Sequence, residues 1–262
     1  MNKQNNEKIK KLINSGGDLA GSAIGGALGF LSSGPAGAAI GASFGNVVGK
    51  VFATVGSDIH GSFISPNEEV RIGAGAAIAI DLVNKRMCAG DTLRSDDFFE
   101  KNGFRRSNAE DILEGTLLKC KSAYEELKVK HAGCFFANLA FRNDIDVCRA
   151  SYLLQTFEKL TYRQLCLIAI FKQVGNSSRS HDLLGKDGTP EQWGILQEVQ
   201  ALKDINFVYQ GDKDLKLQTV WGLGAITPAW VCTTSLGNDF YDLFELNAID
   251  SLEFSNTYKL LL

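Results

Sequence analysis

The chain has 262 residues, of which 45% are hydrophobic and 22% are charged, and its formal net charge is -3. This composition excludes a disordered protein, and the lack of a basic excess argues against a surface built for nucleic acid. Six cysteines lie far apart without any C-x-x-C pair, which is typical of reduced, buried thiols and not of a disulfide framework.

The first fifteen residues are polar and contain four lysines, which suits either an anionic membrane surface or an ordinary solvated terminus. The uncharged run that follows is rich in glycine and alanine, whereas the apolar core of a secretory signal is usually rich in leucine. We therefore expect this N-terminal segment to be retained in the protein.

Glycine occurs at every fourth position in two series that are separated by the turn-forming residues 32–35. This glycine register consists of Gly17, Gly21, Gly25, Gly29, Gly37, Gly41, Gly45 and Gly49. Because residues i and i+4 share one helix face, the register predicts a helical hairpin over residues 16–57 with a smooth face on each arm. A glycine in an exposed helix costs about 1 kcal/mol relative to alanine, so the register indicates a packing role.

The 31 residues from Leu19 to Gly49 contain no ionisable side chain. With its glycine register, the segment is similar to the glycine-zipper segments of bacterial membrane and pore-forming proteins, which implies membrane lipid and further copies of the chain as partners. The first arm is too short to cross a bilayer, and the second crosses it only if Lys50 faces a pore or reaches the surface. A soluble close-packed hairpin and a flexible arm are the alternatives.

Four capping boxes mark expected helix starts, at Ser65, Ser107, Thr161 and Thr189. We expect a helix from Ser65 to Gly90, and a second from Ser107 that breaks near residues 130–133 and resumes through Phe141. Two amphipathic helices follow over residues 144–160 and 161–173. The sequence therefore predicts a mainly α protein with a central helical bundle over residues 65–158.

The text of residues 107–173, which includes "YEELKVKHAGCFFANLAFRNDIDVCRASYLLQTFEKL", resembles helical segments of uncharacterised bacterial proteins, including some of the abortive-infection type. The resemblance implies a role in bacterial defence. It carries no known active residue.

Beyond residue 175 we expect a helix over residues 190–208, strands around 215–222 and 229–236, and a last helix over 237–246. This order, with a Thr-x-x-Gly turn between residues 233 and 237, resembles a winged-helix module and implies DNA binding or protein docking. Residues 160–262 contain eight Lys and Arg against twelve Asp and Glu, which favours protein docking over DNA. The predicted C-terminal domain is a winged-helix-like α+β module over residues 159–262.

No pattern of catalytic or metal-binding residues emerges from the chain. Ser43 lies in a G-x-S-x-G match whose glycines belong to the register, and no buried strand precedes it. The set Cys120, His131, Cys134 and Cys148 fits no zinc spacing. We therefore expect no enzyme activity, no cofactor and no metal.

These patterns favour a non-enzymatic bacterial effector whose glycine-zipper hairpin oligomerises in or disrupts the inner membrane under control of a cytosolic helical domain. Its expected site residues are the eight register glycines and Lys50, and its location is the cytoplasm with inducible or peripheral association with the inner membrane. A protein partner or trigger fits this hypothesis. The alternative is a soluble scaffold or regulator that docks a partner protein through the winged-helix-like module.

Overall fold

The computed structural model describes residues 47–60, 65–101, 103–174, 178, 188–211 and 222–262. These residues are mainly helical, which confirms the predicted fold class at this level. The chain divides into two compact units, residues 1–159 and 160–262. The first seven glycines of the register, from Gly17 to Gly45, lie outside the described residues.

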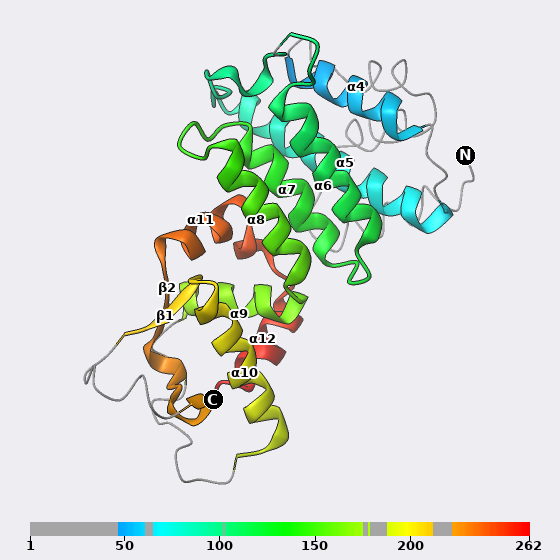
Figure 1. Ribbon diagram of the computed structural model, residues 1–262. Helices are drawn as coiled ribbons and strands as arrows, with labels where there is room; N and C mark the ends of the chain where they lie inside the picture. Colours follow the sequence, from blue (N-terminus) through cyan, green and yellow to red (C-terminus); the bar gives the residue numbers. More distant parts are fainter. Residues whose placement is uncertain (1–46, 61–64, 102, 175–177, 179–187, 212–221) are drawn as a thin grey trace. The chain divides into compact units, whose positions relative to one another are not determined.

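The first unit is a helical bundle, drawn from blue to green in Figure 1. Its helices in chain order are α4 (Val47–His60), α5 (Pro66–Cys88), α6 (Asn108–Ser122), α7 (Lys128–Leu139) and α8 (Val147–Lys159), with a 3-10 turn η1 at Asp97–Phe99. The capping boxes at Ser65 and Ser107 start α5 and α6 as predicted, with both reciprocal hydrogen bonds present.

Helix α5 packs along α6 and α7. Its residues from Ile72 to Asp81 are all buried, and most of them are glycine, alanine or isoleucine. A helix that is apolar on every side is typical of a protein core, so the sequence "IGAGAAIAI" explains why this part of α5 is buried.

The predicted helix break at residues 130–133 is wrong. Helix α6 ends at Ser122, and α7 runs without interruption through Gly133 to Leu139. A Cβ atom at position 133 would lie 2.6 Å from the carbonyl oxygen of Gly75 and 3.0 Å from the side chain of Ile78. Glycine is therefore present at this position because α5 and α7 approach closely there, and tertiary packing overrides its low helix propensity.

The second unit contains α9 (Tyr162–Gln173), α10 (Pro190–Asp204), α11 (Ser235–Leu243) and α12 (Ser251–Lys259). The remaining elements are strands β1 (Val208–Gln210) and β2 (Val231–Thr233) and the 3-10 turns η3 (Gly222–Ala225), η4 (Pro228–Trp230) and η5 (Leu246–Ala248). Capping boxes at Thr161 and Thr189 start α9 and α10, as predicted.

The two strands pair antiparallel, with Tyr209 opposite Cys232. The strand expected near Val231 is confirmed, whereas its partner is formed by residues 208–210, of which the sequence analysis assigned Val208 to the end of a helix and the other two to no element. The strand expected at residues 215–222 falls almost wholly outside the described residues. Thr234 caps α11 by accepting a hydrogen bond from the amide of Gly237 at 3.0 Å, as the Thr-x-x-Gly pattern indicated.

Phenylalanine rings and helix α9 make the core of the second unit. Phe240 lies between Phe207 and Phe244, with ring centroids 4.7 Å and 4.4 Å away. Helix α9 packs against α10, α11, α12 and β2, and its residues Leu165 to Ile170 are fully buried. This is an α+β arrangement in which α9 is the central element.

Candidate functional site

Helix α4 carries Gly49 and Lys50, the two predicted site residues that the structure describes. Gly49 is buried, and Lys50 is exposed. Apolar side chains recur every three or four residues along α4 and are at most 4% exposed: Val48, Val51, Phe52, Val55 and Ile59. This spacing places them on one helix face, so α4 is an amphipathic helix whose apolar face is buried in the first unit.

The buried face of α4 rests on α6, α7 and η1. Phe52 packs edge to face against Phe136 of α7, with ring centroids 5.6 Å apart. Both rings are at most 2% exposed, so this contact lies within the core. We call this set of contacts the α4 seat.

Polar contacts fix the α4 seat at its edge. The guanidinium of Arg106 lies 3.1 Å from the carboxylate of Asp58 and also pairs with Glu114 on α6. Burial alone would lower the pKa of Arg106, but the neighbouring carboxylates outweigh it and raise that pKa. The ionised pair therefore joins the C-terminal half of α4 to α6.

Glu110 makes a second polar link. Its carboxylate accepts a hydrogen bond from the amide of Ser107 at 2.8 Å and lies 3.3 Å from the amine of Lys101, and the nearby hydroxyl of Thr54 on α4 also favours its ionised form. Burial opposes ionisation of Glu110, yet these hydrogen bonds outweigh it, and the pKa of the carboxyl is lowered. The residue that caps α6 thus also lies beside α4.

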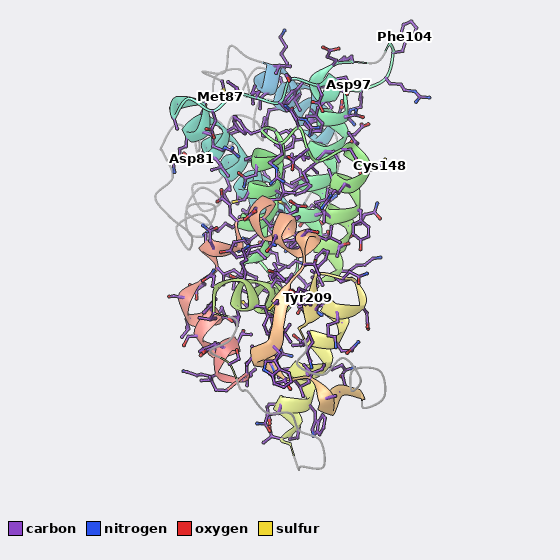
Figure 2. The ribbon with its side chains drawn as sticks, turned by 90° about the vertical axis from the view of Figure 1, so that its left-hand side faces the viewer. Asp81, Met87, Asp97, Phe104, Cys148 and Tyr209 are labelled. Atoms are coloured by element: carbon purple, nitrogen blue, oxygen red, sulfur yellow. The ribbon has the colours of Figure 1, made fainter. Side chains whose placement is uncertain are left out.

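The loop after η1 presents an apolar side chain to solvent. Phe104 is fully exposed, and Figure 2 shows it at the far end of the loop, pointing away from the helices. Gly103 has a φ of +65°, a conformation that favours glycine, and it turns the chain at this tip. Arg105 follows and is exposed. The sequence analysis did not single out Phe104, although an aromatic residue between glycine and two arginines in a polar loop is a visible signal.

The second unit also exposes aromatic side chains. Tyr209 on β1 is 50% exposed and is labelled in Figure 2, and Trp230, just before β2, is 37% exposed. The backbone oxygen of Trp230 accepts a hydrogen bond from the amide of Gly211 at 2.8 Å, so the two aromatic residues belong to one end of the paired strands. Protein interfaces are enriched in such side chains.

Within the described ranges, no group of three or more His, Cys, Asp or Glu side chains could hold a metal ion. Cys120, His131 and Cys134 are buried, and Cys148 is exposed. Among the helices that the structure describes, none is long and apolar enough to cross a membrane. Comparison with protein-family models, curated proteins and solved structures finds no match to this chain.

Proposed function

We propose that the protein is a non-enzymatic, membrane-active effector. In this proposal the glycine register of residues 17–49 self-associates at the bacterial inner membrane and disrupts it, while the first unit holds the register in place. The observation that carries the proposal is the α4 seat: the helix that contains the last register glycine is fixed to a folded unit by its buried apolar face.

The α4 seat divides the predicted hairpin into two parts with different chemistry. Residues 47–60 pack against the rest of the first unit, because three of their valines (Val48, Val51 and Val55), Phe52 and Ile59 are buried. The uncharged text of residues 19–46 precedes them directly in the chain and carries most of the register. A packing surface for lipid or for a second copy is therefore joined to the folded unit without a long linker.

Phe104 and Arg105 support an encounter with a lipid surface. An aromatic side chain that is fully exposed gains free energy at the apolar edge of the headgroup region, and an adjacent cation is attracted to anionic lipid. The loop belongs to the same unit as the α4 seat, since Arg106 at its base pairs with Asp58 of α4.

The role in abortive infection is the biological setting that the resemblance of residues 107–173 implies. In that setting a trigger acts on the folded part of the chain and changes the state of the register. A growth assay in bacteria challenged with phage tests this setting separately from membrane activity.

A second function is favoured by Tyr209 and Trp230. In this alternative the protein is a soluble scaffold or regulator, and the winged-helix-like second unit docks a partner protein through these exposed aromatic side chains. The acidic balance of residues 160–262 favours a protein partner over DNA.

The test uses the full chain expressed in bacteria, with membrane fractionation and a potential-sensitive dye as measurements. In the double variant Gly41→Leu and Gly45→Leu, leucine side chains hold the helix backbones apart, so higher assemblies and depolarisation should be lost. The matched control is Gly194→Leu, because a Cβ at this position in α10 has no atom within 4 Å. Unchanged assembly and depolarisation in the double variant contradict the proposal.

A truncated protein must keep α4. A chain that starts at Ser65 lacks the five buried side chains of the α4 seat, so its behaviour would mix loss of the register with loss of core packing. A chain that starts at Asn46 removes most of the register and keeps the seat. Equal membrane association of this shorter chain and the full chain would favour the scaffold alternative.

A further inference from the structure

The first unit contains a pocket of about 220 Å³ that is separate from the α4 seat. It lies where the end of α6, the turn that follows it, the start of α7 and the end of α8 meet. Cys120, Val129, Ala132 and Phe157 give it apolar walls, and all four are buried. A cavity of about 150 Å³ can hold benzene, so this pocket has room for one aromatic ring with a small substituent.

Lys128 lines this pocket and is only 5% exposed. Its amine donates a hydrogen bond to the backbone carbonyl of Glu158 at 3.1 Å and lies 4.9 Å from the centre of the Phe157 ring. Lysine is rarely buried to this degree, and here it is the first residue of α7, where the helix dipole disfavours a positive charge. If Lys128 served only to stabilise the fold, a position at the C-terminal end of a helix would suit its positive charge better.

The surroundings of Lys128 raise the share of its neutral amine above that of an exposed lysine. Removal from water lowers the pKa of Lys128, and the charges of Glu125 and Glu158 act in the opposite direction without cancelling this effect. The carboxylate of Glu158 is itself paired with Lys119 at 2.6 Å. A neutral amine in an apolar pocket is the nucleophile that forms Schiff bases with carbonyl compounds.

We propose that this pocket binds a small aromatic aldehyde and that Lys128 captures it as an imine. The lone pair of Nζ attacks the carbonyl carbon, the nitrogen gives up one proton, and the carbonyl oxygen takes up a proton to give a carbinolamine. This oxygen then takes up a second proton and leaves as water, the nitrogen gives up its remaining proton, and a C=N bond remains between Nζ and the former carbonyl carbon. The step needs no oxidant or reductant, and Glu125, which lines the same pocket, can carry the protons.

Tyr124 and Lys203 provide controls that distinguish the effect of the pocket from the effect of a lowered lysine pKa. Tyr124 lies at the rim of the pocket and is 78% exposed, so its truncation should leave the fold intact. Lys203 on α10 is a second lysine whose pKa is lowered by burial, but it belongs to the other unit and is not part of this pocket.

The experiment treats the full-length protein with benzaldehyde and sodium cyanoborohydride, which reduces the imine and traps it. Intact mass and peptide mapping then locate the benzyl group. We expect Lys128 to be the first site labelled, ahead of Lys203 and of the exposed lysines. Formaldehyde, which needs no aromatic pocket, should label both Lys128 and Lys203.

Three variants complete the test, each checked for its fold by circular dichroism. Lys128→Met should abolish the early adduct, whereas Lys203→Met should leave it unchanged. Tyr124→Ala should slow benzaldehyde labelling at Lys128 and leave formaldehyde labelling unaffected. In the unsubstituted protein, benzyl groups spread over the exposed lysines, or Lys203 labelled as early as Lys128, would overturn the proposal whatever the variants do.

Discussion

The crossing of α5 and α7 and the α4 seat are two different ways of joining helices within one unit. At the crossing, Gly133 allows the backbone of α7 to approach the carbonyl oxygen of Gly75 and the side chain of Ile78 on α5. At the α4 seat, Phe52 and four aliphatic side chains fill the space, and ion pairs of Arg106 close its edge. Close approach by glycine and filling by large side chains thus occur side by side in the same bundle.

This comparison bears on the glycine register. Gly133 shows that close approach of two helices at a glycine occurs inside a folded unit of this chain, which is the behaviour that the soluble-hairpin alternative requires. Gly49, the last member of the register, is on a helix that is held mainly by large apolar side chains. The register therefore has to be tested by its effect on membranes, because close helix packing alone does not separate the two hypotheses.

We expect the largest effect from a substitution that removes contacts of the α4 seat. Phe52→Ala removes a ring that is 2% exposed and its edge-to-face contact with Phe136, so the free energy of unfolding should fall by about 3 to 5 kcal/mol. Chemical denaturation followed by far-ultraviolet circular dichroism measures this loss. The control is Lys50→Ala on the exposed side of the same helix, which should change stability by less than about 0.5 kcal/mol. Equal stability of the two variants would show that α4 is not held by its apolar face.

We expect the next largest effect from a substitution at the crossing of α5 and α7. Gly133→Ala places a methyl group 2.6 Å from a backbone oxygen and 3.0 Å from Ile78, so α5 and α7 must move apart. We expect a loss of about 1 to 3 kcal/mol in the free energy of unfolding, although alanine has the higher helix propensity. The same denaturation experiment measures it. A gain in stability would mean that the crossing can widen at no cost.

The helix starts could be predicted from the sequence, because capping is local chemistry. Each box needs only a hydroxyl and a carboxylate or amide three residues apart, and all four predicted boxes are present with both hydrogen bonds. The α6–α7 boundary could not be predicted in this way. Gly133 looks like a helix breaker until its neighbour Gly75, 58 positions earlier in the chain, is known.

The candidate functional residues could also be predicted only in part. The register is visible because it repeats at a fixed period, and Lys50 because it interrupts an uncharged stretch. The role of α4 depends on partners far along the chain, such as Phe136, and no local pattern contains them. Lys128 is one of many lysines in the text, and only the fold reveals that its amine lies against Phe157 and the carbonyl of Glu158.

A smaller effect depends on pH and tests the polar edge of the α4 seat. Because the pKa of Glu110 is lowered in the folded protein, its stabilising contribution is present above its ordinary value of 4.5 and is lost as the pH falls through the folded value. Glutamine also completes a capping box, so Glu110→Gln should keep the start of α6 and lose only the charge interactions. Between neutral and acidic pH, the variant should therefore lose less stability than the unsubstituted protein.

Denaturation curves at several pH values measure this difference, and both proteins share the other acidic groups of the chain. The contact with Lys101 and the hydroxyl of Thr54 are the interactions that the substitution weakens. Parallel losses of stability in acid for the two proteins would show that the carboxylate of Glu110 contributes through its capping hydrogen bond alone.

The smallest expected effect is a gain in stability, and it serves as the reference for the glycine substitutions in the register. Gly194 lies inside α10 and a Cβ there meets no atom within 4 Å, so Gly194→Ala should stabilise the protein by about 0.5 to 1 kcal/mol through helix propensity. Fluorescence of the adjacent Trp193 during denaturation measures this gain.

The same change at Gly21, Gly25, Gly41 and Gly45 adds four methyl groups, which raise helicity wherever the glycine makes no contact with another helix. If those four alanines weaken self-association and membrane damage while Gly194→Ala stabilises α10, the register is a contact surface. If both substitutions only increase helicity, the register is not a contact surface. The lack of charged residues between Leu19 and Gly49 would then be the remaining sequence argument for membrane activity.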